Sequence, residues 1–207
     1  MTRLACLALL LLCACMTSCK RGPDALAVDP GVDVMAIPSF ALTDHTGAPR
    51  DETIFRHPGV TVLDFTFTSC PFICPPMNAS MLRLQREFGG TTGRLPVRFV
   101  SISVDPTRDT PETLAQHAEN IGADTSTWTF LTGDIATIER ICRDGLKMTI
   151  GGDDSRTIEL AGGETMTNIP HSSKFVLVRS DGVPIGVYDG TSEDDVSRLI
   201  ARIRAAF

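Results

Sequence analysis

The chain has 207 residues, 43% of them hydrophobic and 21% charged, which is typical of one globular domain with a buried core and leaves no need for a second domain. The net charge of −6 and the lack of a basic cluster argue against a nucleic-acid partner.

The N-terminus has the pattern of an export signal. Arg3 precedes a short apolar run, which ends in Met16-Thr-Ser-Cys19. This ending resembles a bacterial lipobox, so we expect residues 1–18 to be a lipoprotein signal peptide and Cys19 to be lipidated. Cys15 is a competing cleavage site, and a soluble secreted protein is the alternative. The predicted location is therefore outside the cytoplasm, on a membrane facing the periplasm or extracytoplasmic space.

Residues 19–36 contain glycine and proline with little periodicity, which predicts a membrane-tether linker ahead of a single domain at 37–207. Only Cys70, Cys74 and Cys142 then remain in the folded body. An odd number of cysteines in an oxidising compartment argues against a disulfide-stapled scaffold.

The first half of the domain alternates strand and helix patterns. Residues 38–43 and 51–55 flank a predicted hairpin turn, and the β-branched and aromatic run 59–67 predicts a central strand. Apolar residues at helical spacing predict a helix over 75–88, with its two prolines tolerated in the first turn. A second buried strand is predicted at 97–104, and a helix from the capping Thr110 to Ile121, before Gly122.

The second half continues the alternation. We expect a strand at 128–131, a helix from Asp134 through Arg143, and an inserted hairpin or flap over 147–169. A strand pair at 173–178 and 184–188 and a final amphipathic helix capped by Ser192 complete the chain. This order predicts an α/β thioredoxin-like fold, a central mixed sheet flanked by helices, with the flap before the histidine-bearing strand.

Two cysteines four residues apart, Cys70 and Cys74, lie between the predicted central strand and the helix that follows it. On a first helical turn they would share one face, where unpaired N–H groups favour thiolate over thiol. Such a pair can hold a soft metal or exchange electrons as a dithiol and disulfide. A purely structural disulfide is the alternative, but closing so short a loop removes little entropy from the unfolded chain.

Three features occur in a fixed order: Cys70-Pro-Phe-Ile-Cys74, the segment that begins Ser-Val-Asp105-Pro, and His171 ahead of a predicted strand. Together they resemble the Sco/SenC/PrrC family of copper-binding proteins, from about residue 40 to the end. The resemblance implies copper, as Cu(I) or Cu(II), held by Cys70, Cys74 and His171. It also implies maturation of the dinuclear copper centre of cytochrome c oxidase, as metallochaperone or thiol reductant.

The resemblance further implies partners, namely the copper-bearing oxidase subunit or another copper chaperone. Asp105 is a candidate for supporting the site without binding copper. Pro170 suggests a cis peptide bond before it. Ser69 and Phe72 stand where the family commonly has histidine and aspartate, and Pro170 where it commonly has an acid.

The remaining candidates have simpler interpretations. We expect His45, His57 and His117 to be solvated surface residues, Cys142 to be a buried inert thiol, and Met77 to pack in the core. Because the same dithiol suits exchange chemistry, a thiol:disulfide oxidoreductase and a copper or redox sensor remain alternatives, and enzymatic activity stays open. A peroxiredoxin-like enzyme is disfavoured, since no Thr-x-x-Cys pattern is present.

Overall fold

The computed structural model describes residues 25–32, 35–89, 96–148, 150, 157–159, 165–167 and 172–206. Its strands are β1 (Leu42–Asp44), β2 (Pro49–Arg50), β3 (Val60–Thr66), β4 (Val97–Ser103), β5 (Trp128–Thr132), β6 (Thr157–Glu159), β7 (Thr165–Thr167), β8 (Lys174–Arg179) and β9 (Pro184–Asp189). Its α-helices are α1 (Cys74–Phe88), α2 (Pro111–Ile121), α3 (Ile135–Arg140) and α4 (Glu193–Ala206).

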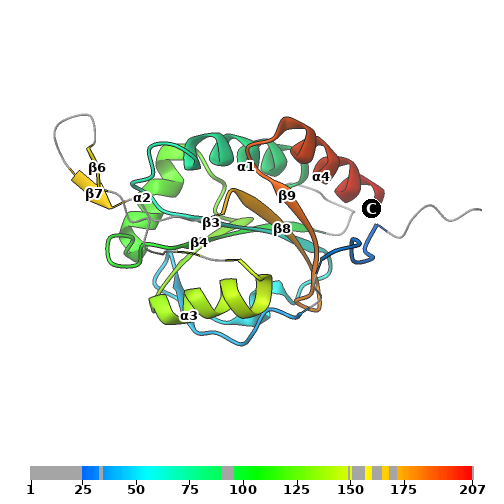
Figure 1. Ribbon diagram of the computed structural model, residues 1–207, viewed down its shortest axis with the longest axis horizontal. Helices are drawn as coiled ribbons and strands as arrows, with labels where there is room; N and C mark the ends of the chain where they lie inside the picture. Colours follow the sequence, from blue (N-terminus) through cyan, green and yellow to red (C-terminus); the bar gives the residue numbers. More distant parts are fainter. Residues whose placement is uncertain are drawn as a thin grey trace, which may run out of the picture.

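Seven strands form one mixed sheet in the order β2-β1-β5-β4-β3-β8-β9 (Figure 1). The strands β3, β4 and β5 are parallel, and β8 and β9 extend the sheet antiparallel beside β3. The predicted thioredoxin-like α/β arrangement is confirmed. The carboxyl ends of β3 and β4 meet at the same edge, which is where open α/β sheets carry their sites.

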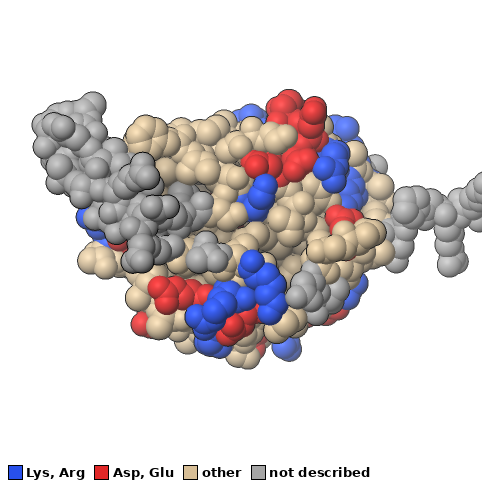
Figure 2. Space-filling model, in the orientation of Figure 1, with Lys and Arg blue, Asp and Glu red and all other residues tan. Residues whose placement is uncertain are grey.

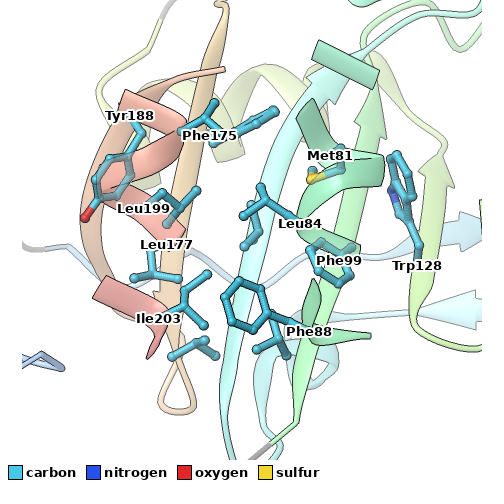
Figure 3. Packing of buried hydrophobic residues seen from close by; sticks show 14 of the residues in the cluster. Met81, Leu84, Phe88, Phe99, Trp128, Phe175, Leu177, Tyr188, Leu199 and Ile203 are labelled. Carbon is cyan, nitrogen blue, oxygen red and sulfur yellow. The ribbon is translucent and has the colours of Figure 1, made fainter. Parts of the chain in front are cut away.

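Three helices cover one face of the sheet. Figure 1 shows α1 and α4 together above the strands, and buried residues of α2 belong to the same hydrophobic cluster. Figure 3 shows this packing, in which side chains of α1 and α4 meet those of the central strands: Met81, Leu84, Phe88, Phe99, Trp128, Phe175, Leu177, Tyr188, Leu199 and Ile203. These ten side chains are at most 7% exposed, so α1 is held firmly at both ends.

The opposite face is covered by α3 and by irregular segments near the start of the domain. Its cluster includes Ile37, Phe40, Phe55 and Ile138, packed on residues of β3, β4 and β8. The alternation along β3 explains the two clusters, because Val62 faces one side and Leu63 the other.

Two local predictions were wrong. Residues 52–55 form a 3-10 helix capped by Asp51, and the hairpin partner of β1 is the shorter β2. The helix predicted through Arg143 stays α-helical only to Arg140 and continues as a π-helix, Ile141–Gly145. The last residue of that π-helix, Gly145, packs closely against another segment, since a Cβ there would lie 2.8 Å from Pro38.

The region predicted as a flap contains the separate two-stranded sheet of β6 and β7, paired antiparallel. Figure 1 shows this hairpin at the end of the molecule near α2. Within the part of the chain that the structure describes, no helix has the length and apolar character needed to cross a bilayer.

The segment 25–32, part of the predicted linker, lies against the last helix and the last strand. Arg202 of α4 organises it, donating to the carbonyl oxygens of Ala25 and Ala27 and to the carboxylate of Asp29, 2.6 Å away. The Asp29 N–H also donates to the carbonyl of Ile185 in β9. These contacts cover Arg202, whose side chain is only 12% exposed. We call residues 25–32 the docked segment.

Charges of both signs are interspersed on the face seen in Figure 2, with acidic side chains gathered at the start of α4 and basic ones beside them. The acidic group consists of Glu193, Asp194 and Asp195 in the first turn of α4. Its position suits the positive end of the helix dipole.

Candidate functional site

The two cysteines lie where β3 ends and α1 begins. The chain leaves β3 at Thr66 and turns, with the Cys70 N–H donating to the carbonyl of Phe67. Cys74 is the first residue of α1, whereas Cys70 precedes the helix. The expectation that both cysteines belong to one helical turn is therefore corrected, although they remain neighbours.

The sulfur of Cys70 replaces a helix cap. No side chain caps the start of α1 at Ile73, and Pro75 and Pro76 have no N–H groups to offer. The Cys74 N–H instead donates to Cys70 Sγ at 3.5 Å. The N-terminus of α1 thus directs its few backbone donors at one sulfur atom.

The environments of the two thiols drive their pKa values apart. A hydrogen bond from the Cys74 thiol, assisted by backbone N–H groups and opposed by burial, lowers the pKa of Cys70 from 9.0 to about 5. The same hydrogen bond, with burial, raises the pKa of Cys74 above its ordinary value. Cys74 is 3% exposed and accepts a bond from Thr66 Oγ1 at 3.5 Å, while Cys70 is partly exposed. Cys70 is the reactive thiolate and Cys74 the protonated partner.

The cysteine turn is tied to the loop after β4 by Asp109, which sequence reasoning missed. Its carboxylate accepts from the Thr68 N–H at 3.1 Å and the Thr68 hydroxyl at 2.5 Å. The hydroxyl of Ser103, the last residue of β4, donates to the same group at 2.5 Å. Asp109 is fully buried, so it fixes the turn relative to β4.

The candidate supporting residue Asp105 points to a different partner. Its carboxylate pairs with Arg108 at 2.7 Å, and its N–H donates to Ser103 Oγ at 3.0 Å. The loop makes a helical turn here, with the Asp109 N–H donating to the Asp105 carbonyl. That turn brings Asp109 rather than Asp105 to Thr68. The sequence indicates that an acidic residue after β4 supports the site, but only the turn of the loop shows that this residue is Asp109.

Three of the predicted features lie outside the described residues: the third ligand His171, the cis bond at Pro170, and the lipidation candidate Cys19. Within the described ranges, no three His, Cys, Asp or Glu side chains come close enough to hold a metal ion.

A groove of about 360 Å³ runs from the cysteines between α1 and α2. Cys70 and Cys74 line one end, followed by Ala79 and Leu82 of α1, and by His117 of α2. His117 lies on the apolar stripe of α2, four residues before Ile121, so helical periodicity was the signal that could have placed it.

The prediction that the other histidines are solvated was wrong. His117 is mostly buried against the ring of Phe130, and burial lowers its pKa. His45 accepts the Phe130 N–H at 3.3 Å, and His57 bonds the Thr61 hydroxyl at 2.9 Å.

Two further predictions of packing are confirmed. Met77 is 1% exposed in the hydrophobic cluster beneath α1, α2 and α4, and Cys142 is fully buried on the face of the sheet that α3 covers. Burial, with the nearby charge of Glu139, raises the pKa of Cys142 to about 12. Its thiol is therefore protonated and inert.

The donor chemistry at the turn fits copper. A thiolate on Cys70 and a second sulfur on Cys74 are soft donors, which Cu(I) prefers over harder oxygen ligands. The same pair can lose two electrons and form a disulfide. The site is thus suited to soft-metal binding and to thiol exchange.

Comparison with known proteins identifies the family. The SCO1/SenC family model matches residues 31–207. The chain is 32% identical over 148 residues to the SCO1 protein homolog of Bacillus subtilis, covering 71% of this chain and 70% of that one. A Stutzerimonas stutzeri protein named for copper binding is 29% identical over 150 residues, with 71% and 66% covered. The chain spans 59% of the mitochondrial SCO2 homologs of Bos taurus and Homo sapiens.

Solved structures agree with this assignment. BsSco, described as having a disulfide switch and belonging to the Sco family of cytochrome c oxidase assembly proteins, superimposes with a TM-score of 0.67 at 28% identity. That match covers 86% of this chain and 97% of BsSco. A SCO1/SenC family lipoprotein from Bacillus anthracis gives 0.62 at 28% identity, over 82% and 93%. The chain belongs to the SCO1/SenC family.

Proposed function

We propose that this protein is an exported, lipid-anchored copper-binding protein that serves the maturation of the dinuclear copper centre of cytochrome c oxidase. Cys70, Cys74 and His171 hold the copper, which is cargo rather than a resident cofactor. The observation that carries the proposal is the pair of sulfur atoms at the start of α1, where a hydrogen bond from Cys74, assisted by backbone N–H groups, lowers the pKa of Cys70.

The relatives support each part of this proposal. The S. stutzeri relative is named for copper binding, and BsSco is described as a member of an oxidase assembly family. The B. anthracis relative is a lipoprotein, which agrees with the lipobox-like sequence ending in Cys19. The proposed partners are the copper-bearing oxidase subunit or another copper chaperone.

Copper titration of the reduced protein tests the proposal. We expect the wild-type chain to take up one equivalent of Cu(I) in competition with a chelator, and His171→Ala to bind at least about tenfold more weakly because one ligand is lost. His57→Ala is the matched control, since His57 lies near the opposite end of β3. Failure of the wild type to bind copper at equimolar addition, or equal binding by His171→Ala, contradicts the proposal.

A second function is favoured by the unequal thiols. A thiolate at Cys70 beside a protonated Cys74 is the arrangement that a thiol:disulfide oxidoreductase needs. This activity requires both cysteines but not His171. Reduction of a partner disulfide that survives in His171→Ala, in protein that binds no copper, would favour this second function.

A further inference from the structure

The groove between α1 and α2 opens directly beside the reactive sulfur. Cys70 lines its end, and its side walls are formed by Ala79 and Leu82 of α1 and by Ile121 of α2. Its volume of about 360 Å³ falls in the range of pockets that hold a small ligand or a side chain. Anything joined to Cys70 therefore lies next to this groove.

Away from Cys70 the lining is apolar or neutral. Among the described residues that line the groove there is no Asp, Glu, Lys or Arg, and burial lowers the pKa of the His117 imidazole. Two polar side chains meet across the groove, where the Asn78 amide of α1 and His117 Nε2 of α2 are 3.5 Å apart. An anionic side chain would lose its hydration here and would also face the Cys70 thiolate.

The apolar character continues onto the outer surface of the turn. Phe72, two residues after Cys70, is 65% exposed, the most exposed of the large apolar side chains in the described part of the chain.

We propose that this groove binds an apolar side chain adjacent to a cysteine in an extended segment of the partner protein. The inference rests on the proposed function, because the partner's sulfur must reach Cys70 either to accept copper or to be reduced. The residue next to that sulfur then enters the groove.

The exchange reaction gives a direct measure of this selectivity. The Cys70 thiolate attacks one sulfur of a peptide disulfide, forming a mixed disulfide and releasing one peptide thiol. Cys74 then loses its proton and attacks Cys70, so that the second peptide thiol leaves and the Cys70–Cys74 disulfide forms. Two electrons pass from the Cys70–Cys74 pair to the peptide disulfide, and the two peptide thiolates take up the proton released by Cys74 and one proton from solvent.

The experiment compares two disulfide-linked peptides that differ only in having leucine or serine beside the cysteine. The full chain in detergent is used, with Cys6, Cys13, Cys15 and Cys19 changed to serine. Each rate is divided by the rate of the same variant with 2-hydroxyethyl disulfide, which has no neighbouring residue. This division removes differences in the intrinsic reactivity of Cys70.

We expect the wild type to prefer the leucine peptide about tenfold, as hydrophobic pockets discriminate a few methylene groups.

Ala79 is exposed on the groove wall, so Ala79→Glu should reduce the leucine preference to roughly twofold or less. Ala79→Gln, which adds a side chain of similar size but no charge, should also lower this preference. Ala136→Glu, the same change at an exposed position of α3, should keep it.

Equal rates for the two peptides in the wild type, or a preference that persists in Ala79→Glu, would overturn the inference. A leucine preference that weakens as protein concentration rises, with dimers in sedimentation, would instead assign the groove to a second copy of this chain and also overturn it. If the wild type fails to bind copper but still prefers the leucine peptide, the metallochaperone function is rejected and the inference about the groove stands.

Discussion

The Asp109 carboxylate accepts two hydrogen bonds from Thr68, one from its backbone N–H and one from its hydroxyl, and so links the loop after β4 to the turn that presents Cys70. Asp109→Asn replaces one acceptor oxygen with a donor that faces these groups. We expect a loss of about 2 kcal/mol in the free energy of unfolding, measured in urea, and altered alkylation of Cys70.

Asp105→Asn is the control for this change. Asp105 pairs with Arg108, whose side chain is 49% exposed, so its loss should cost less than about 1 kcal/mol. If Asp109→Asn is as stable as the wild type and its Cys70 reacts at the same rate, the carboxylate does not hold the turn.

The reactivity of Cys70 should follow its lowered pKa. In reduced, metal-free protein, the rate of alkylation by iodoacetamide should rise with a midpoint near pH 5 and be level from pH 7 upward. Cys74→Ala removes the thiol donor that contributes most to the lowering, and should raise the midpoint by about one unit or more. A wild-type midpoint near 9, or an unchanged midpoint in Cys74→Ala, would contradict this account.

The same shift predicts a pH dependence of stability. The pKa of Cys70 is lower in the folded protein than in the unfolded chain, so the thiolate stabilises the fold fully above about pH 9. That contribution is lost as the pH falls through about 5. Urea unfolding of the reduced protein, compared with Cys70→Ala across this range, measures it.

Asp64 in the middle of β3 should change the stability with pH in the direction opposite to that of Cys70. One of its carboxylate oxygens accepts from Ser101 Oγ at 2.5 Å, the other has no hydrogen-bond partner among the described residues, and burial raises its pKa to about 7. A raised pKa stabilises the fold below about pH 4, and this stabilisation is lost as the pH rises through 7.

We therefore expect Asp64→Asn to flatten the stability profile between pH 4 and 8, and to raise the free energy of unfolding at pH 8 by roughly 2 kcal/mol. Asp194→Asn, at an exposed position in α4, should leave the slope unchanged. A slope in Asp64→Asn equal to that of the wild type would show that Asp64 is ionised throughout.

Cys142 should take no part in either chemistry. Because it is fully buried with its pKa raised to about 12, it should resist alkylation until the protein unfolds. Cys142→Ala should bind as much copper as the wild type and lose about 1 kcal/mol of stability from the small cavity. Mass spectrometry after timed alkylation distinguishes Cys142 from Cys70, and rapid modification of Cys142 in folded protein would contradict its burial.

The periodicity of apolar residues was enough to predict the main strands and helices, because β3 and β4 are buried on both faces and α2 carries its own signals at Thr110, Pro111 and Gly122. Of the two elements that differed, the 3-10 helix has a local cap at Asp51, whereas the π-helix meets a distant segment of the chain. The π-helix ends where Gly145 meets Pro38, and no local pattern contains that contact.

In the candidate site, too, local sequence patterns predicted some features, whereas others depend on how distant segments pack. The spacing of Cys70 and Cys74 predicted a reactive pair, but their unequal acidity depends first on which thiol donates to the other, and then on which sulfur faces the backbone N–H groups at the start of α1. The role of Asp109 follows from a turn of the loop after β4. His117 was detectable by helical spacing, but its position beside the cysteines required the packing of α2 against α1.

The docked segment meets the sheet at the start of β9, where the Asp29 N–H donates to the carbonyl of Ile185, and the Ile37 N–H, a few residues on, donates to the carbonyl of Gly182 in the β8–β9 turn. Because β3 runs antiparallel to β8, this is the end of the sheet opposite the cysteine turn. The chain from Cys19 to Ala25 can extend at most roughly 20 Å. With a lipid on Cys19, as proposed, the bilayer would lie close to one pole of the domain. Cys70 would point outward from the other pole, towards partners that project from the same membrane.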